Sequence, residues 1–358
     1  MFEVESYTKR FDANKVVVNE YGQYPYIVRT SSNNGQKGYI VEDERYLNDG
    51  NTIAFGQDTA TMFYQEKPYF TGDKIKVLKP KDGRFNKNNA QFFLAAMRKP
   101  FELFSWGTSS FNVEIIKSQK IVLPVKDGEI DFTFMESFIA ELEAQRIAEL
   151  SAYLKVSGFD NYELSIEELN ALQRFEDFKD EDWDSYRVGD LFERVYSKKL
   201  PYKAKELPKQ PIEGHVLPCL TSSFQNQGLN YYAPMEGATV LSNVISIPSN
   251  SDVYRAYYQS RDFTVLSDAY AIRWKTDEVE ISPNHYLFVV MCINKVTDLP
   301  IYSYKNKLGG WNVVKEKYIK LPARNGEIDF KFMEIFISAI KKMAIKDVVL
   351  YRNERLKQ

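Results

Sequence analysis

The sequence has very few of the residues that build metal centres and disulfide frameworks. It contains two cysteines and two histidines among 358 residues, which is too few for a zinc site of the common kinds or for a disulfide network. Two isolated cysteines, Cys219 and Cys292, are typical of core positions in a reducing compartment. We therefore expect a cytoplasmic protein that holds no metal ion.

Long uncharged apolar stretches are also missing. A membrane span needs roughly 18 consecutive apolar residues, and no such run occurs. The first fifteen residues carry charges throughout and lack the apolar core of a signal peptide. Neither secretion nor membrane insertion is expected.

The excess of positive charge that commonly marks nucleic-acid binding is absent from the chain as a whole. Lys and Arg total 47 and Asp and Glu total 49, which gives a net charge of −2. Any contact with nucleic acid must therefore be local. Basic residues do cluster, as Lys74, Lys76, Lys79, Lys81, Arg84 and Lys87 in the first half and Lys198, Lys199, Lys203, Lys205 and Lys209 in the second.

Motifs of the common enzyme classes are missing as well. There is no G-x-x-x-x-G-K-S/T phosphate loop, no H-E-x-x-H pair, no G-x-S-x-G elbow, and no Asn-Pro-Pro-aromatic signature of an amino-methyltransferase. Glu129 and Asp131, repeated as Glu327 and Asp329, stand at helix entrances, where capping explains them better than a catalytic dyad. His285 also precedes an apolar helix and is expected to be structural. We expect a non-catalytic chain with no cofactor.

What the sequence does contain is a long internal repeat. The segment Leu123–Glu136 recurs as Leu321–Glu334 with ten of fourteen positions identical. An offset of about 198 residues is too large for a solenoid and indicates a duplicated domain. Upstream, we match Tyr26–Ser32 with Val216–Ser223, Phe111–Val113 with Trp311–Val313, and Phe2–Glu5 with Tyr186–Gly189. The chain is two halves that diverge between these anchors.

Each copy of the repeat leads into an amphipathic helix. Residues 129–155 contain no Pro or Gly and carry an apolar stripe at helical spacing, and the second copy continues in the same way towards the C-terminus. Two helices of about 25 residues are predicted. Each stripe could pack its helix on its own domain, but the duplication favours mutual pairing as an antiparallel coiled coil.

The rest of each half predicts short strands separated by turns. These strands are Thr52–Phe55, Lys74–Leu78, Lys120–Leu123, Ala238–Leu241, Tyr270–Trp274 and Tyr318–Leu321. We expect α+β domains at 1–122 and 185–320, helices at 123–160 and 321–358, and a linker at 161–184. The linker contains a short helix capped by Ser165.

Polar loops at matched positions carry groups that read base edges or bind phosphates. Asn and Gln can bind adenine in a bidentate manner, whereas hydroxyls and lysines favour phosphates. One such loop alone is more typical of a solvated surface, but two at matched positions favour DNA readout. The candidates are Arg29, Thr30, Ser31, Ser32, Asn33, Asn34, Gln36 and Lys37 in the first half, and Thr221, Ser222, Ser223, Gln225 and Gln227 in the second. A second candidate surface holds Thr108 and Ser109, matched by Lys307 and Trp311, where small residues let backbone amides approach phosphate.

The layout resembles the specificity subunit of Type I restriction-modification systems over nearly the whole chain. The resemblance rests on an I-x-L-P segment and then G-E-I-D-F-x-F-M-E, which follow each variable half and lead into a long helix. It implies two target-recognition domains and two conserved helices that bind two methyltransferase subunits and, in a restriction complex, endonuclease subunits. Recognition subunits of Type IIB and IIG enzymes share this layout.

We therefore expect a subunit that reads a bipartite double-stranded DNA target and directs partner methyltransferases. A helix of about 25 residues spans roughly 37 Å, close to the roughly 34 Å of one DNA turn, so the helix pair would set the spacing between half-sites. The alternative is an assembly scaffold whose domains recognise protein. An enzyme with an unfamiliar active site has no supporting motif. One departure from symmetry is that the linker and its helix precede the second half, whereas the first half begins almost at Met1.

Overall fold

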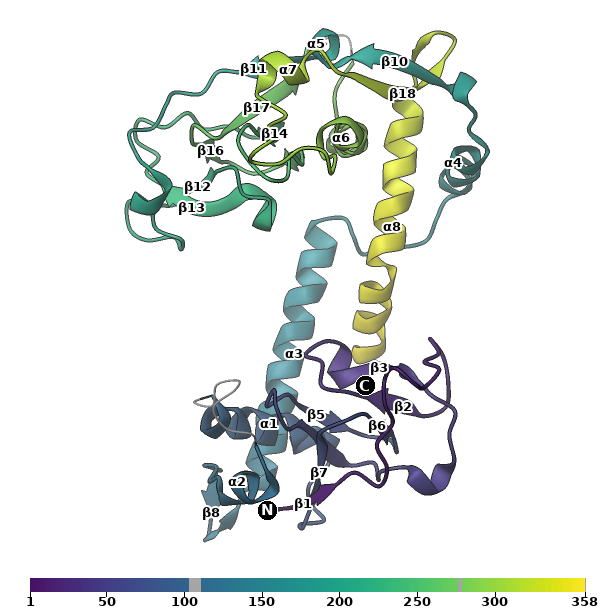
Figure 1. The fold of residues 1–358 in the computed structure, drawn as a ribbon, viewed down its shortest axis with the longest axis vertical. Coiled ribbons are helices and arrows are strands. Elements are labelled where there is room, and N and C mark those ends of the chain that lie inside the picture. Colours follow the sequence, from purple (N-terminus) through teal and green to yellow (C-terminus); the bar gives the residue numbers. More distant parts are fainter. Residues whose placement is uncertain (103–110, 276–278, 358) are drawn as a thin grey trace. The chain divides into compact units, whose positions relative to one another are not determined.

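The computed structural model describes residues 1–102, 111–275 and 279–357 (Figure 1). Its contacts divide the chain into two compact units, Met1–Ala152 and Tyr153–Gln358, here called unit 1 and unit 2. Both units combine helices with small sheets. The expected mixture of helices and strands and the division into two halves are therefore confirmed.

The main sheet of unit 1 is antiparallel. It consists, in spatial order, of β1 (Phe2–Ser6), β7 (Ile75–Pro80), β4 (Thr52–Gly56) and β5 (Met62–Gln65). Every residue of β4 is buried, as expected for a strand covered on both faces. Helix α1 (Lys87–Phe101) adds Phe93 and Met97 to the same core, and Asn86 caps its first turn.

Unit 2 repeats this sheet with other residues. Its strands are β11 (Phe192–Val195), β17 (Ala269–Trp274), β14 (Val244–Pro248) and β15 (Tyr257–Gln259) in the same spatial order, and α6 (Pro283–Thr297) is the counterpart of α1. The cross-strand pairs run Val4–Leu78–Ile53 in unit 1 and Arg194–Ile272–Ile245 in unit 2. The two sheets therefore share one register.

The shared register corrects one of the matches made from sequence. The backbone N–H of Lys81 donates to the Met1 carbonyl over 2.9 Å, and that of Lys275 donates to the Leu191 carbonyl over 2.9 Å. Met1 is thus equivalent to Leu191, and β1 is equivalent to β11. The match of Phe2–Glu5 with Tyr186–Gly189 is wrong, because a similarity of four residues does not define a strand register.

A smaller sheet accompanies each main sheet. In unit 1 it contains β3 (Gln36–Tyr39), β2 (Pro25–Ile27) and β6 (Phe70–Thr71), and in unit 2 it contains β13 (Leu229–Ala233), β12 (Leu217–Leu220) and β16 (Thr264–Val265). The central strand pairs antiparallel with one neighbour and parallel with the other in both units. This shared topology shows that the whole domain is duplicated.

The repeated motif forms a hairpin before it forms a helix. Strands β8 (Val125–Lys126) and β9 (Glu129–Ile130) pair in unit 1, and the end of β18 (Tyr318–Arg324) pairs with β19 (Glu327–Ile328) in unit 2. Both residues of each connecting turn, Asp127–Gly128 and Asn325–Gly326, have positive φ, as a two-residue hairpin turn of type I′ requires.

The long helices follow directly. Helix α3 spans Phe132–Val156 and α8 spans Phe330–Arg355, with 25 and 26 residues. The carboxylate of Asp131 accepts the backbone N–H of Phe134 over 2.8 Å, and that of Asp329 accepts the N–H of Phe332 over 3.0 Å. The predicted helices and the capping role of both aspartates are confirmed.

Two of the predicted strands are wrong. Leu241 makes only an isolated bridge with Phe263, and residues 238–240 belong to no strand. Residues 120–123 lie between α2 (Val113–Ser118) and β8 without pairing to any strand of the described residues. The β-branched and apolar residues of both segments suit a strand, but a strand also requires a neighbour to which its backbone groups can bond. The other predicted strands are confirmed, with boundaries that differ by a few residues at most.

Unit 2 contains a segment that has no described counterpart in unit 1. This segment, here called the arm (residues 166–191), comprises α4 (Ile166–Asp177), β10 (Trp183–Arg187) and α5 (Val188–Leu191). Helix α4 packs beside α8 and β10 pairs antiparallel with β18 (Figure 1). The side chain of Ser165 caps α4 as predicted.

A buried ion pair fastens the arm to α8. The Glu168 carboxylate, which is almost fully buried, lies 2.8 Å from the Lys342 ammonium and also accepts hydrogen bonds from the Ser338 hydroxyl and the Ser165 backbone N–H. Burial by itself raises the pKa of Glu168, but these hydrogen bonds outweigh it and lower the pKa to about 2.

Replacing Glu168 by Gln is expected to loosen α4, because the variant leaves the Lys342 ammonium without its anion in a half-buried site. The expected loss at neutral pH is about 3 kcal/mol, measured as faster hydrogen exchange of the α4 amides. Since the folded pKa lies below the ordinary 4.5, this stabilisation is present above about pH 4.5 and disappears as the pH falls towards 2. The variant should lack that acid transition.

The neighbouring variant Glu167→Gln is the control, because Glu167 is exposed on the same helix turn. Equal exchange rates in the two variants at pH 7 would contradict the role of the ion pair.

Candidate nucleic-acid interface

A polar loop joins the first two strands of the smaller sheet in each unit. Loop 1 (residues 28–36) follows β2 and loop 2 (residues 221–229) follows β12, and each contains one turn of 3-10 type. Three successive residues have positive φ in each loop, namely Asn33, Asn34 and Gly35 (46°, 54° and 79°) and Asn226, Gln227 and Gly228 (47°, 54° and 87°). Such a run is uncommon outside glycine, so both loops have one unusual backbone.

Matching side-chain hydrogen bonds show which residues of the two loops correspond. The Thr30 hydroxyl accepts the Ser32 backbone N–H over 3.2 Å, and the Ser223 hydroxyl accepts the Gln225 N–H over 3.1 Å. Thr30 is therefore equivalent to Ser223. The match of Tyr26–Ser32 with Val216–Ser223 is therefore wrong by two residues at its Thr-Ser-Ser end. It aligns identical residue types, whereas the turn geometry equates other positions.

The asparagine that opens each left-handed run closes the loop. The side-chain amide of Asn33 donates to the Gln36 carbonyl over 3.3 Å, and that of Asn226 donates to the Leu229 carbonyl over 2.7 Å. Each amide thus uses one of its two N–H groups to close the loop. Asparagine tolerates the left-handed region better than most residues because its side chain can bond the local backbone.

A buried glutamine supports each loop from beneath. The amide of Gln65 at the end of β5 donates to the Asn34 carbonyl, and the amide of Gln259 at the end of β15 donates to the Gln227 carbonyl, both over 3.2 Å. Both glutamines are almost fully buried. The sequence analysis missed them, although the aromatic-Tyr-Gln triplets that end at Gln65 and Gln259 are a detectable signal.

The exposed tips carry different chemistry on this common backbone. Ser31 and Ser32 of loop 1 occupy the positions of Phe224 and Gln225 in loop 2, and all four are exposed. Hydroxyls suit phosphates or a range of base edges, whereas a Gln amide matches adenine and an aromatic ring offers apolar contact. The two loops therefore present the same geometry and different contacts.

Arg29 and Lys37 flank the tip of loop 1 in different environments. The Arg29 guanidinium lies 2.6 Å from the Asp58 carboxylate, which also binds the Lys74 ammonium over 2.7 Å. Arg29 thus supports the loop through a charge network. Lys37 is exposed at the start of β3, and its neighbour Gln36 is half-buried.

The remaining candidates do not gather at these tips. Thr221 and Ser222 are half-buried at the base of loop 2, and Thr108 and Ser109 lie outside the described residues. Trp311 opens α7 (Trp311–Val314) and packs 6.4 Å from the Tyr270 ring beside the core of unit 2. Helix α7 lies at the opposite end of unit 2 from β12 and β13 (Figure 1), so Trp311 belongs to the core packing.

Lys307 is also engaged, with its ammonium 4.8 Å from the centre of the Tyr304 ring.

The two basic clusters differ in how far acids neutralise them. In unit 1, Lys79 binds Glu5 and Asp49 over 3.0 Å each. Arg84 binds Asp82, and its hydrogen bonds lower the pKa of that carboxyl to about 2. The lysines of residues 198–209 in unit 2 are all exposed, and none makes an ion pair within the part of the chain that the structure describes.

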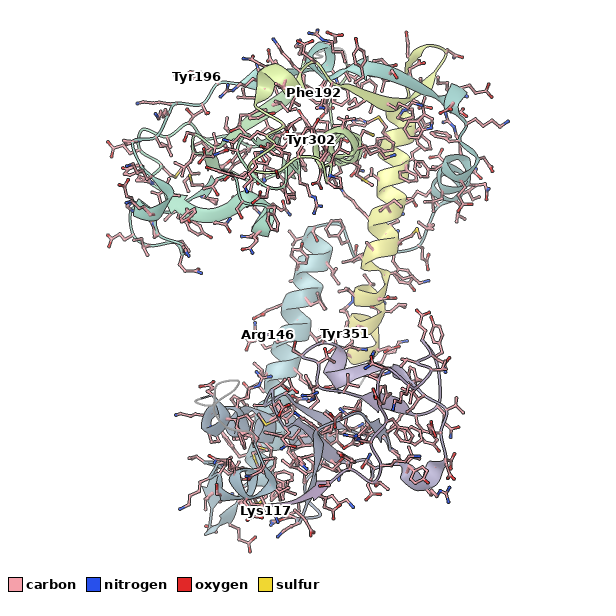
Figure 2. All side chains as sticks on the ribbon, viewed as in Figure 1. Lys117, Arg146, Phe192, Tyr196, Tyr302 and Tyr351 are labelled. Carbon is pink, nitrogen blue, oxygen red and sulfur yellow. The ribbon has the colours of Figure 1, made fainter. Side chains whose placement is uncertain are left out.

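That second cluster, here called the basic segment (residues 196–209), also carries Tyr196, which projects from the surface of unit 2 (Figure 2). Exposed lysines and a tyrosine hydroxyl are groups that bind the DNA backbone.

Among the described residues, no group of three His, Cys, Asp or Glu side chains could hold a metal ion. Burial raises the pKa of the Cys219 and Cys292 thiols to about 12, so both remain neutral core residues as predicted. His285 caps α6, with Nδ1 accepting the Ser282 backbone N–H over 3.0 Å, which confirms its structural role. No described helix is long and apolar enough to span a bilayer.

Comparison with known families agrees with the duplication. The family described as Type I restriction modification DNA specificity domain matches residues 1–152 and again residues 180–351. The chain belongs to this family. Specificity subunits of the family are non-catalytic and recognise DNA sequence, so this specificity subunit is the recognition component of a restriction-modification system. The expectation drawn from the repeat is confirmed.

Two known proteins show how far the likeness extends. The specificity subunit S.BcgI of a Type II restriction enzyme from Heyndrickxia coagulans is 25% identical over 340 residues, which is 94% of this chain and 91% of that protein. The Type I specificity subunit from M. genitalium has a solved structure that superposes with a TM-score of 0.57 at 13% identity, covering 99% of this chain and 90% of that one. The second likeness concerns the fold alone.

Replacing Gln65 by Leu is expected to disorder loop 1, because the Asn34 carbonyl loses its buried donor. The expected cost is about 1 kcal/mol in the stability of unit 1, together with about a tenfold loss of affinity for target DNA, measured by fluorescence anisotropy. Gln259→Leu should have the same effect through loop 2.

Gln145→Ala on the exposed surface of α3 is the matched control and should change neither quantity. Undiminished DNA affinity in both loop variants would show that the loops do not contact the target.

Proposed function

We propose that this specificity subunit reads a bipartite double-stranded DNA target, with loop 1 in one half-site and loop 2 in the other. We assign the two recognition domains to residues 1–122 and 185–320. The observation that carries the proposal is the duplicated loop, because one unusual backbone is kept while its exposed side chains differ. Two domains that recognise different DNA sequences on one scaffold need a shared loop backbone and different exposed side chains.

Base contacts come in this proposal from the loop tips. Ser31, Ser32, Asn33 and Asn34 form the tip of loop 1, whereas Phe224, Gln225 and Gln227 form that of loop 2. Rigid backbones favour this role because a side chain that is already positioned loses little entropy on binding. Arg29, Thr30 and Ser223 support the tips from the loop itself, and Gln36, Lys37, Thr221 and Ser222 flank them.

Phosphate contacts come from the basic segment in unit 2. Its lysines are exposed and have no carboxylate partners in the described residues, so little desolvation or competition opposes their binding to phosphates. This local charge explains how a chain of net charge −2 holds DNA. Affinity should accordingly fall as salt concentration rises.

The two long helices pair in this proposal as an antiparallel coiled coil that holds the readers apart. Their near-equal lengths support the idea, as do apolar side chains that each helix leaves exposed, among them Leu142 on α3 and Met343 and Tyr351 on α8. Twenty-five residues rise about 37 Å, close to the roughly 34 Å of a helical turn of DNA. The pair would set the spacer between the half-sites.

The specificity subunit carries no methyltransferase motif, so the methyl group must be transferred by partners. We propose that two methyltransferase subunits bind it, one for each half, and that endonuclease subunits join in a restriction complex. Each half carries its own copy of the duplicated domain and its own long helix, so each half can bind one methyltransferase subunit.

The decisive test is sequencing of methylated bases in cells that carry the specificity subunit with its cognate methyltransferase, compared with cells that lack the specificity subunit. One interrupted, bipartite methylated motif is expected to appear. If the complex forms and no motif appears, the domains recognise protein and the chain is an assembly scaffold.

Matched loop variants then assign each half-site. The double variant Ser31→Ala/Ser32→Ala should relax only one half of the motif, and Phe224→Ala/Gln225→Ala should relax only the other, because these pairs occupy equivalent positions. Each lost base contact is expected to cost about 1 to 3 kcal/mol of discrimination. Relaxation of both halves by either variant would contradict separate readers.

Lengthening both helices tests the spacing. Seven residues inserted into the middle of α3 and of α8 add two turns, or about 10 Å, which corresponds to about three base pairs at 3.4 Å each. The methylated motif should keep both half-sites and gain a spacer of that length. A change in the half-sites with an unchanged spacer would rule out the idea that the helix pair sets the spacer.

A further inference from the structure

The arm of unit 2 covers an apolar edge that unit 1 leaves open. In unit 2, β10 pairs with β18 along residues 183–187, and the backbone N–H groups of Val188 and Gly189 donate to the carbonyls of Lys317 and Lys315, each over 2.8 Å. Under this cover, Ile319 and Leu321 of β18 are 1% and 0% exposed. The arm therefore closes one side of the domain.

The corresponding edge of unit 1 is residues 120–124, here called the open edge. The backbone N–H of Asp131 donates to the Pro124 carbonyl and that of Asp329 to the Pro322 carbonyl, both over 2.9 Å, so the two edges are in register. Ile121 and Leu123 are thus the counterparts of Ile319 and Leu321. They are only half-buried, Val122 between them is 88% exposed, and no described strand pairs with this edge.

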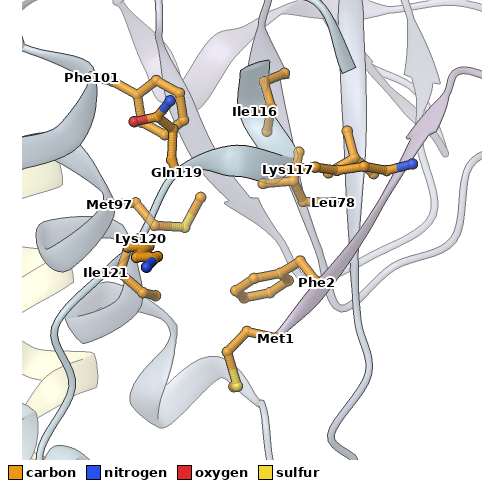
Figure 3. Close-up of a pocket in the computed structure, with 11 residues that line it drawn as sticks. Met1, Phe2, Leu78, Met97, Phe101, Ile116, Lys117, Gln119, Lys120 and Ile121 are labelled. Atoms are coloured by element: carbon orange, nitrogen blue, oxygen red, sulfur yellow. The ribbon is translucent and has the colours of Figure 1, made fainter. Parts of the chain in front are cut away.

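A cavity adjoins the open edge. It has a volume of about 350 Å³ and lies between β1, β7, α1 and α2 (Val113–Ser118), where Phe2, Leu78, Met97, Ile116 and Ile121 point into it (Figure 3).

Met1 stands at the rim of the cavity and is the counterpart of Leu191. In unit 2, the residues just before Leu191 are those of α5, where Val188 is fully buried in the core. The cavity is therefore in the place that α5 fills in unit 2.

The first turns of the long helices show the same difference. Phe332 and Phe336 of α8 are 4% and 8% exposed, whereas their counterparts Phe134 and Phe138 of α3 are 49% and 46% exposed. In unit 2 the arm region supplies the cover, with the ring centre of Phe175 4.4 Å from Phe336 and that of Phe178 4.8 Å from Phe332. Phe134 and Phe138 of α3 therefore lack the cover that the arm gives to Phe332 and Phe336.

We propose that the open edge, the cavity and the Phe134–Phe138 surface together bind a segment of the partner methyltransferase that has the chemistry of the arm. Such a segment has a short amphipathic helix with aromatic side chains, a strand that pairs antiparallel with residues 120–124, and an apolar residue followed by glycine. The identity of the partner rests on the proposed function.

The duplicate domain sets the chemistry of this ligand. A Cβ at Gly189 would come within 2.8 Å of the Lys315 carbonyl oxygen, so the segment needs a glycine after the residue that enters the cavity. Antiparallel pairing satisfies the free backbone groups of the open edge. DNA is a poor occupant, because Lys117 and Lys120 are the cationic side chains of the cavity lining, whereas most of that lining is apolar.

A second copy of the same chain is a poor donor. Its arm is already held by the Glu168–Lys342 ion pair and by the rings that cover Phe332 and Phe336. If one copy gave its arm to unit 1 of another copy, its own unit 2 would lose that cover. The exchange would therefore bury no additional surface. A different polypeptide is therefore the favoured source.

The first experiment uses a synthetic peptide of residues 174–191 as the probe and the full chain as the receptor. We expect one peptide per chain to bind, with a dissociation constant in the micromolar range by fluorescence anisotropy. Amide exchange of residues 119–123 should slow at least tenfold. A peptide with Val188→Asp and Gly189→Val should bind at least tenfold more weakly. Failure of the unmodified peptide to bind would overturn the site.

Matched variants of the open edge give the second readout. Side chains alternate along an extended segment, so Ile121→Lys is expected to abolish peptide binding. Val122→Lys should preserve it, because β18 carries Lys320 at the equivalent position. Equal effects of the two variants would overturn pairing in the proposed register.

The methyltransferase itself is used to test whether it provides the segment that binds the open edge. Its addition to the full chain should protect residues 119–123 from exchange, and excess peptide should reverse that protection. Protection that grows with the concentration of the specificity subunit alone, or a complex in which the open edge stays unprotected, would overturn the assignment to the methyltransferase. Peptide binding does not depend on DNA, so a failure of bipartite readout would be recognised separately.

Discussion

The register between the buried central strand and its neighbours determines where each unit places its functional groups. All residues of β4 and β14 are buried, so a slip of one residue would exchange the side chains that pack on the two covered faces. That register pairs Thr52 with Gln65 and Val244 with Gln259. Each glutamine is thereby held beneath a loop that it could not support from any other position.

The same constraint explains how one scaffold can hold two specificities. Within each loop, the buried glutamine amide bonds a backbone carbonyl, so it stabilises the loop whatever residues stand at the tip. The left-handed run requires small or amide residues at three positions only, and the preceding residues are free to differ as Ser31 and Phe224 do. Stability and readout thus depend on separate atoms.

The asymmetry between the units is as informative as their likeness. Unit 2 uses its arm to cover Ile319, Leu321, Phe332 and Phe336, whereas the equivalent residues of unit 1 remain partly or largely accessible. Exposed apolar surface next to unpaired backbone groups is costly for an isolated chain and favourable for a partner to cover. A recognition subunit that must assemble with other chains can use such a surface as its point of attachment.

Local features of the sequence were sufficient to establish the two halves, both long helices, their aspartate caps and the family, because these depend on periodicity and on contacts within a few residues. The correspondence of Thr30 with Ser223, the support from Gln65 and Gln259, and the unpaired state of residues 120–124 were decided by tertiary structure. Each depends on which strand lies beside which. The aromatic-Tyr-Gln triplets mark Gln65 and Gln259 in the sequence, but they do not show which backbone carbonyl each amide contacts. The residues of a recognition loop can therefore be located from sequence, but their geometry comes from the sheet beneath them.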